Sequence, residues 1–524
     1  MIARRMAPLL DWYAARRRRA LERVSRDAAQ IQERALLSLV AAARDTEFGL
    51  AHGFASIRSI ADYQACVPVG EYRDVAPLLH RALGGECSIV WPGRTRDWVR
   101  TAGTTAGPKI IPVTAEAFSS HQKGAWDAFL MGVGRVGARH LVGGPMLLLG
   151  GSTAFSPAGD GGQIGDLSGF IVRRLPPGIR GLYSPGPELS AIPDWGTRID
   201  AVAALASRQD VRLLAGIPSW LVVLLERVAR ARQTGGCAVR DLGQCWPNLR
   251  VLIHGGVAFA PYASALDEWI GRRLERIEVY PASEGFVGMQ TEASGGLTLM
   301  LDYGIFYEFI PVEDLGGAKP RRHTVAEVEL GRAYAVVVST PAGLWSYLLG
   351  DAVRFTKRDP LRLFISGRTR HYVNACGENV IVEEVERALV GACRRTEAEV
   401  VEFTVAPRFP SAGEPRSGHE WLVEFRVCPS EPDDFVRILD ETLVSLNGDY
   451  RTRRSGDLEM VPPRVTALPP GTFHRWMRDA GKLGDHHKVP RAMNDRALAE
   501  ALLAVAGEQA RPLVPSHPGA FSYS

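Results

Sequence analysis

The sequence lacks the features that would place a protein in a membrane or outside the cell. Its longest apolar patches, such as "GPMLLLGG", are about half as long as a membrane span of about 20 residues. The arginine-bearing start "MIARRMAPLLDWYAARRRRALERV" is not followed by the apolar run of a signal peptide. We therefore expect a cytoplasmic protein with no membrane span.

Paired cysteines and net charge are also scarce. The chain has 7 cysteines in 524 residues, with no CxxC pair and no HExxH zinc spacing, so we interpret the cysteines as reduced thiols. Its 62 basic and 58 acidic residues leave a net charge of only +4. This small excess gives no reason to expect a nucleic-acid partner, although it is compatible with a weak attraction for anionic substrates.

What the chain does have is length and alternating elements. At 524 residues it exceeds the usual single core of about 250–300 residues, which predicts two or more domains. Residues 1–45 show helical spacing of apolar residues. Short apolar runs bounded by Gly or Pro then predict strands, at "SIVWP", "MLLLGG", "RLLAGIP", "RVLIHGG" and "RIEVYPASEG". Helical patterns lie between some of them, at "SWLVVLLERVARARQ" and "PYASALDEWIGRRLERI".

This order predicts a mixed α/β fold whose sheet is parallel at least in part. Clusters of β-branched and aromatic residues predict a more antiparallel zone at "GIFYEFIPVE", "TVAEVEL" and "AYAVVVST". After the charged joint "KRDPLRLFISGR", helices and strands alternate again in a smaller unit. We predict a large domain over residues 1–360 and a small, hinged α+β domain over 361–524.

The arginine run Arg16–Arg19 lies inside the first helical pattern. We interpret it as a solvated helix face, with a membrane or partner patch as the alternative. Gly132, Gly134 and Gly137 spell GxGxxG, but a predicted helix precedes them and a strand follows. A dinucleotide fingerprint needs the reverse order, so we predict a plain helix-to-strand turn.

The stretch "RTAGTTAGPKIIPVT", from Arg100 to Thr114, is rich in threonine and glycine. Glycines allow backbone N–H groups to converge on an anion, hydroxyls add donors, and Lys109 adds a point charge. The spacing is not that of a P-loop ATPase, yet the chemistry suits the phosphates of a nucleotide. A flexible surface turn is the alternative for this stretch alone.

Further segments follow in a fixed order. "VYPASEGFVGMQ" places Glu284 directly after a strand, and "SYLLGDAVRF" carries Gly350 and Asp351. "FISGRTRHYVN" carries Arg368 at the predicted domain joint, and "GKLGDHHKVPR" carries Lys488. In this order the segments resemble the nucleotide motifs, hinge and C-terminal lysine of the adenylate-forming enzymes. They resemble most closely the GH3 family of auxin-responsive acyl acid amido synthetases and its bacterial relatives. "GIFYEFIPVED", "GDGGQIGDLSG", "LAGIPSW" and "HHKVPR" add to this likeness, which spans residues 45–495.

The resemblance implies an enzyme that uses ATP and Mg²⁺. A carboxylic acid would attack the α-phosphate to form an acyl-adenylate, and an amine, usually of an amino acid, would then displace AMP. Catalytic roles would fall to Lys109 on the phosphates, Glu284 as the magnesium ligand and Lys488 on the mobile small domain. ATP contacts would come from Thr101, Gly103, Thr104, Thr105, Gly255, Gly256, Tyr280, Ala282, Ser283, Asp351 and Arg368.

Among these, Asp351 would accept hydrogen bonds from the ribose hydroxyls, because an ionised carboxylate is only an acceptor and a diol offers two donors. The acyl pocket is less marked in the sequence. Ile217, Ser219 and Trp220 follow a predicted strand and are candidates for its wall, together with the helix "QKGAWDAFLMG". A plain core position is the alternative for Trp220.

The chain departs from the family pattern at three places. Ala102 stands where the phosphate loop often has serine, Leu348 stands where an arginine is common, and "TRHYVN" lacks the usual acidic hinge residue. An amido synthetase is the leading hypothesis. An acyl-CoA ligase with the same first half-reaction and a non-catalytic nucleotide binder are the alternatives.

Overall fold

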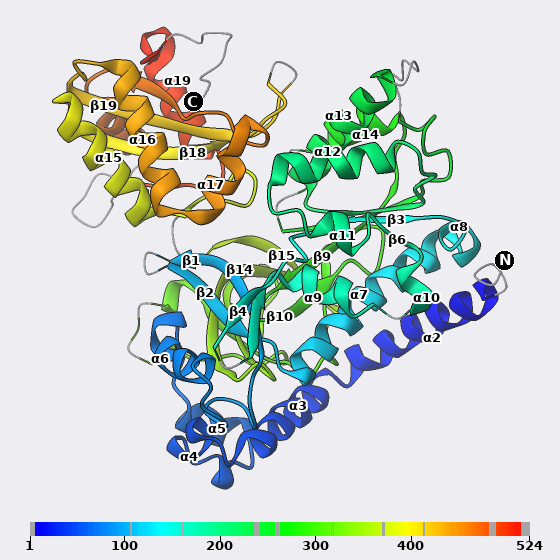
Figure 1. Ribbon diagram of the computed structural model, residues 1–524. Coiled ribbons are helices and arrows are strands. Elements are labelled where there is room, and N and C mark those ends of the chain that lie inside the picture. Colours follow the sequence, from blue (N-terminus) through cyan, green and yellow to red (C-terminus); the bar gives the residue numbers. More distant parts are fainter. Residues whose placement is uncertain are drawn as a thin grey trace. The chain divides into compact units, whose positions relative to one another are not determined.

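The structure, a computed structural model, divides into two compact units (Figure 1). The first comprises Met1–Thr101 and Lys109–Thr369, and the second comprises Ala102–Pro108 and Arg370–Ser524. The described residues are 6–104, 107–159, 161–175, 177–234, 242–256, 259, 262–315, 317, 319–368, 372–411, 414–480 and 489–514.

An eleven-stranded sheet forms the centre of the first unit. Its parallel part is β6 (Tyr183–Ser184), β3 (Met146–Leu149), β7 (Leu213–Gly216), β8 (Val251–Gly255) and β9 (Glu275–Ala282). The antiparallel part continues through β10 (Gly285–Met289), β11 (Leu297–Leu299), β15 (Leu361–Arg368), β14 (Leu344–Arg358), β13 (Ala333–Thr340) and β12 (Phe306–Pro311). The predicted mixed sheet, parallel first and antiparallel later, is confirmed.

Helices cover both faces of the parallel part. Leu130 and Met131 of α7 (Ala115–Val136) share a buried cluster with Val251 and Ile277 of the sheet. Figure 1 shows α12 (Trp195–Ala206), α13 (Pro218–Thr234) and α14 (Ala263–Ile270) on the other side of β3. Because helices bury both faces of these parallel strands, the side chains on both faces are apolar, and the strand sequences are nearly continuous apolar runs.

A second, four-stranded sheet lies in the order β2 (Gly107–Pro112), β1 (Asp97–Thr104), β5 (Gly162–Gly165), β4 (Ser156–Ala158). β1 and β5 are parallel, with Trp98 opposite Ile164. The threonine-rich stretch therefore lies where β1 ends and β2 begins.

The second unit is a sheet with helices on both faces. Its strands run β18 (Glu399–Arg408), β19 (Gly418–Val427), β20 (Arg464–Leu468) and β21 (Arg511–Pro512). Trp421 and Val423 of β19 pack with α15 (Val382–Thr396) and α16 (Pro432–Leu446), whereas Leu422 packs with α18 (Thr472–Asp479) and α19 (Ala497–Ala506). Successive side chains of a strand point to opposite faces, which produces this division.

Two predicted strands are wrong. The apolar run at 88–92 is a loop that closes on itself, because the Ser88 N–H donates to the Gly93 carbonyl at 2.7 Å. The apolar side chains of this loop are buried, although its backbone pairs with no neighbouring strand. Buried loop residues therefore gave the same apolar pattern as a strand. The stretch 324–330 is a turn in which the Glu327 carboxylate accepts from the Thr324 N–H at 2.8 Å.

The GxGxxG sequence of Gly132, Gly134 and Gly137 lies at the end of a helix, as predicted. Gly132 and Gly134 lie within α7, and Gly137 ends the helix with φ +85°. The six described cysteines are free thiols, as predicted. No helix within the described residues is long and apolar enough to cross a membrane.

The interpretation of the arginine run as a solvated face is wrong for Arg17. The run lies on α2 (Ala7–Arg26), followed by α3 (Ala28–Ala43), and Arg17 points inward. Its guanidinium donates to Asp127 of α7 and to Asp302 in the loop after β11, each at 2.7 Å. This ion cluster ties α2 to the body of the unit.

Candidate functional site

Glu284 lies in a tight hairpin turn between β9 and β10. Ala282 pairs with Gly285, so Ser283 and Glu284 form a two-residue loop. A Cβ at Gly285 would meet Ile305 Cδ1 at 2.6 Å, so a larger residue here would require the buried Ile305 side chain to shift. Glu284 is 8% exposed, and no hydrogen bond or ion pair joins its carboxylate to another residue in the described part of the chain. The turn therefore presents a carboxylate with unused acceptor capacity.

Tyr280 and Asp351 bring the second and third motifs into contact. The Tyr280 hydroxyl donates to Asp351 Oδ2, and both side chains are buried. Tyr280 is on β9 and Asp351 is on β14, which lie on different sides of β10, β11 and β15 in the sheet. A hydrogen bond to a carboxylate is among the stronger kinds, so this contact orients the Asp351 side chain.

Lys109 brings the first motif to the same strand. Its ammonium donates to the Tyr347 hydroxyl at 3.1 Å and lies 5.7 Å from the centre of that ring. The ring of Tyr72, on α6 (Tyr72–Leu83), lies 5.8 Å away, and its hydroxyl accepts from the Ile110 N–H at 2.9 Å. The two rings hold a cation at the base of the threonine-rich stretch.

The two contacts meet on one strand. Tyr347 and Asp351 are four residues apart on β14, a separation of roughly 13 Å along an extended strand. Gly350 stands between them with φ +91°, a conformation that glycine adopts without strain. Residues of β2, β9 and β14 are therefore within the length of a nucleotide from one another.

The carboxyl ends of β7 and β8 lie beside β9. Gly255 pairs with Val279, and a Cβ on Gly255 would meet the Val279 carbonyl oxygen at 2.2 Å. Gly256 has φ +87°, and the Ile217 side chain lies 3.5 Å from where its Cβ would stand. In open α/β sheets, ligands bind outside these strand ends, so Ile217 and the two glycines lie at a suitable edge.

Trp220 packs as a core residue. It is buried on α13, and its ring centre lies 4.6 Å from that of Trp195 on α12. This packing agrees with the core position that the sequence left open as the alternative, and the pocket role of Trp220 stays a prediction. Leu348 is also accounted for by packing, because it lies against Ile310, Ala335 and Val337 on the face of β14 opposite Tyr347.

Several predicted residues have no described side chain. Thr105 and Lys488 lie outside the described residues. Only the backbone is described for Ala102, Gly103, Thr104, Ser219 and Arg368; in that backbone Arg368 pairs with Asp351. The predicted roles of all these residues stay predictions.

Sequence reasoning missed His121, which lies on α7 beside the hairpin turn. Burial lowers its pKa to about 4, and a hydrogen bond to the Ser283 backbone opposes that shift. A bond that favours the protonated ring is one in which the ring donates, so Nε2–H donates to the Ser283 carbonyl. Nδ1 has no hydrogen-bond partner among the described residues, and neither has the buried Oγ of Ser120. A single histidine in an apolar helix carries no sequence signal, and only the fold brings it to Ser283.

The site fits a magnesium ion of the kind held mainly by its substrate. No group of three or more His, Cys, Asp or Glu side chains within the described residues is placed to hold a metal. Mg²⁺ is commonly bound by one or two carboxylates together with phosphates and water. Glu284, with its unused acceptor capacity, matches that pattern.

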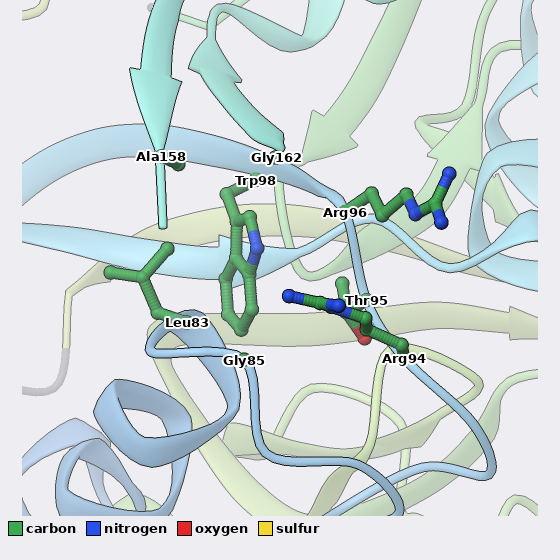
Figure 2. A pocket seen from close by; sticks show the side chains of 8 residues that line it. All are labelled: Leu83, Gly85, Arg94, Thr95, Arg96, Trp98, Ala158 and Gly162. Atoms are coloured by element: carbon green, nitrogen blue, oxygen red, sulfur yellow. The ribbon is translucent and has the colours of Figure 1, made fainter. Parts of the chain in front are cut away.

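A hollow in the first unit lies apart from these residues. Figure 2 shows the Trp98 indole standing between Leu83 on one side and Arg94 on the other. The hollow is shallow and open to solvent, and it encloses no room for a water molecule. It lies at the start of β1, roughly 20 Å along the strand from its end at Thr104. None of the predicted nucleotide-binding residues lines it.

Solved structures of adenylate-forming enzymes share this fold. The GH3.15 acyl acid amido synthetase in complex with 2,4-DB matches with a TM-score of 0.58 at 18% identity, over 93% of this chain and 95% of that chain. A 2-hydroxyisobutyryl-CoA ligase in its thioesterification state matches with a TM-score of 0.53 at 15% identity, over 91% and 92% of the two chains. At these identities the likeness establishes the fold.

Sequence models identify the family within that fold. The GH3 family N-terminal domain matches residues 17–185, the central domain 298–368 and the C-terminal domain 383–497. The three matches together cover well over half of the chain. The protein belongs to the GH3 family.

Curated relatives are plant enzymes of that family. Indole-3-acetic acid-amido synthetase GH3.8 of Oryza sativa subsp. indica is 27% identical over 53% of this chain and 49% of its own. An Arabidopsis thaliana enzyme of the same kind, GH3.3, is 26% identical over 49% and 46%. The chain thus spans about half the length of these relatives. Jasmonoyl-L-amino acid synthetase JAR4 of Nicotiana attenuata is 23% identical over 91% and 93%.

Proposed function

We propose that the protein is an ATP- and Mg²⁺-dependent ligase that joins a small carboxylic acid to an amine, most simply an amino acid, through an acyl-adenylate. The observation that carries the proposal is the pair of contacts Lys109–Tyr347 and Tyr280–Asp351. They join three motifs of a GH3 chain on one strand, at the edge where such sheets take ligands. The reaction class, formation of an amide, is taken from the curated relatives, which are an amido synthetase and an amino acid synthetase.

In the first half-reaction a carboxylate oxygen attacks the α-phosphorus of ATP. The bond from that phosphorus to the bridging oxygen breaks, and pyrophosphate leaves with the electron pair. Lys109 neutralises charge on the phosphate oxygens, and placed electrostatics of this kind carry most of the catalysis in phosphoryl chemistry. Mg²⁺, when held at Glu284, spreads the negative charge of the phosphates.

Asp351 serves the ribose in this proposal. A carboxylate accepts at about four lone-pair positions, so the side chain that accepts from Tyr280 is of a kind that can also accept from sugar hydroxyls. In the second half-reaction the amine nitrogen attacks the acyl carbon and AMP leaves with the electrons of the broken bond. A role for Lys488 in one of these steps is implied by the family resemblance alone and stays a prediction.

The test is ATP–pyrophosphate exchange across a panel of aromatic and aliphatic acids. We expect exchange with at least one acid, and a loss of about 100-fold in Lys109→Ala and Glu284→Ala. Lys319→Ala, which removes an exposed lysine elsewhere in the unit, is the matched control. ATP binding without exchange for any acid would instead identify a non-catalytic binder.

An acyl-CoA ligase is the second candidate, favoured by the structural match to the 2-hydroxyisobutyryl-CoA ligase. Both candidates share the adenylation step, so exchange does not separate them. Offering the preformed adenylate an amino-acid mixture and CoA side by side, and identifying the product by mass, separates them. An amide supports the proposal, and a thioester alone supports the ligase.

A further inference from the structure

The N-terminal helix α2 has one face that the fold uses and one that it leaves exposed. Ala7, Ala14 and Leu21, seven residues apart, are buried in the cluster that contains Leu130 and Met131 of α7. Arg17 lies on the flank of this inner face and is neutralised by Asp127 and Asp302. Figure 1 shows α2 running along the edge of the first unit beside α7 and α8 (Ala138–Leu141).

The exposed face carries a continuous line of side chains. They are spaced three or four residues apart, which places them on one side of a helix with 3.6 residues per turn. The members of this line, which we term the outer stripe, are Leu9, Trp12, Arg16, Arg19 and Arg23.

The first half of the outer stripe is apolar. Leu9 is 47% exposed and Trp12 is 51% exposed, and Met6 and Tyr13 beside them are exposed as well. These four large apolar side chains lie between residues 6 and 13, and the ring centres of Trp12 and Tyr13 are 5.0 Å apart. Such a group differs from the single exposed apolar residues that most surfaces carry.

The second half of the outer stripe is basic and unneutralised. Arg16, Arg19 and Arg23 are exposed, and within the described part of the chain no acidic side chain pairs with them. The Arg16 guanidinium lies 5.3 Å from the centre of the Trp12 ring, so the two halves adjoin. Of the acidic residues of the helix, Asp11 accepts from the Ala138 N–H, and Glu22, which is exposed beside Arg19, forms no ion pair with the outer stripe among the described residues.

We propose that the outer stripe binds the surface of an anionic phospholipid bilayer. The arginines complement lipid headgroups of negative charge, each contributing about a fivefold gain in binding near the surface. Trp12 and Leu9 enter the boundary between headgroups and acyl chains, where an amphipathic aromatic ring is favoured. A nucleic acid would match the arginines but would leave the apolar half exposed. The protein therefore lies on the bilayer, held by one face of one helix.

The test is co-sedimentation of the full chain with vesicles. One set contains phosphatidylcholine alone, and the other contains phosphatidylcholine with about one third phosphatidylglycerol. We expect binding to the anionic vesicles that weakens as salt is raised from 50 to 300 mM, because salt screens such charges. Arg16→Glu/Arg19→Glu/Arg23→Glu should weaken this binding by at least about 100-fold.

A second triple variant controls for net charge. Arg34→Glu/Arg394→Glu/Arg395→Glu reverses three exposed arginines outside α2 and should bind as the unaltered protein does. Leu9→Ser/Trp12→Ser keeps every charge and should weaken binding to anionic vesicles about tenfold or more. Circular dichroism checks that each variant is folded, and Arg→Gln replacements substitute for any that is not.

Three results would overturn the proposal. They are absence of binding to anionic vesicles, equal binding to neutral and anionic vesicles, and an equal loss in the control triple variant. Binding to a DNA duplex that matches or exceeds vesicle binding, and that survives Leu9→Ser/Trp12→Ser, would assign the arginines to nucleic acid instead.

Discussion

At the scale of single residues, the site depends on two tyrosine hydroxyls that orient charged groups. Tyr280 donates to Asp351, and Tyr347 accepts from Lys109. Both tyrosines are buried, so neither hydroxyl exchanges its partner for bulk water without cost. The charges that would meet a nucleotide are thus held in place before it arrives.

Replacing Tyr280 by phenylalanine tests this arrangement. The ring and its packing remain, whereas Asp351 loses the donor that orients it, and a hydrogen bond to a charged group contributes about 1.5–3 kcal/mol. We expect the KM for ATP in pyrophosphate exchange to rise about tenfold or more. Tyr63→Phe, which removes a buried hydroxyl bonded to Ser339 outside the site, should leave that KM unchanged. Equal effects of the two variants would mean that only general stability had changed.

His121 makes the stability of the fold sensitive to acid. Its folded-state pKa of about 4 lies below the ordinary value of 6.5, so the unfolded chain binds the proton more readily. The free energy of unfolding therefore decreases as the pH falls below 6.5, and this decrease continues down to about pH 4. Between pH 7 and pH 5 this one ring accounts for about 2 kcal/mol. His254, whose pKa burial and Arg276 lower to about 3, acts in the same direction.

The measurement is denaturant unfolding at pH 7 and pH 5. His121→Gln keeps an amide donor at the position of Nε2 for the Ser283 carbonyl but does not titrate, so its stability should fall less between the two pH values than that of the unaltered protein. His80→Gln replaces an exposed histidine and should reproduce the unaltered difference. If His121→Gln showed the full acid loss, the buried ring would not be its source.

At the scale of elements, the ion cluster around Arg17 holds α2 to α7. Lys123 adds a second cation, since its ammonium donates to Asp302 at 2.9 Å, and the Tyr303 hydroxyl donates to Asp127 at 2.7 Å. Burial raises the pKa of Asp127, while the positive charge of Arg17 opposes that rise. The helix is thus fixed by a charge network as well as by apolar packing.

Removing Arg17 should destabilise this element selectively. Arg17→Met leaves Asp127 buried without its cation, and breaking a buried pair in this way costs about 3 kcal/mol. Arg18→Met, one residue along the same helix and exposed, should change the free energy of unfolding by less than about 0.5 kcal/mol. Urea unfolding of the two variants makes the comparison, and similar midpoints would show that the network does not stabilise the fold.

At the scale of the whole molecule, each unit has its own core. In the second unit the buried carboxylate of Glu378 accepts from the Ala375 and Cys376 N–H groups and contacts His419 Nε2 at 2.7 Å. Burial opposes ionisation, but these hydrogen bonds outweigh it and lower the pKa of Glu378. Among the described residues, the two buried apolar clusters of this unit consist only of residues between 373 and 513.

A fragment of residues 370–524 should therefore fold alone. We expect cooperative thermal unfolding and blue-shifted fluorescence from Trp421, which is fully buried in the core of this unit. The fragment should catalyse no pyrophosphate exchange, because Lys109, Glu284 and Asp351 are in the first unit. A fragment without a cooperative transition would show that its core depends on the rest of the chain.

Much of the fold could be predicted because periodicity reports burial. Strands β3, β7, β8 and β9 and helix α13 coincide with predicted segments, and helices and strands alternate in the second unit as predicted. The errors at 88–92 and 324–330 arose where apolar side chains are buried in loops and turns, since burial without pairing has the same pattern as a strand. Leu348, which stands where an arginine is common in the family, packs into an apolar cluster on the face of β14 opposite Tyr347.

The sequence by itself determined the family and the order of the motifs, because those depend on residue identity along the chain. Glu284 after a strand, Asp351 after Gly350 and Lys109 after a threonine-rich stretch are local patterns. Only the tertiary structure decided which of these residues meet. The Tyr280–Asp351 contact joins residues 71 positions apart and the Lys109–Tyr347 contact joins residues 238 apart. Pairings at such separations follow from strand order in the sheet, and no local pattern encodes that order.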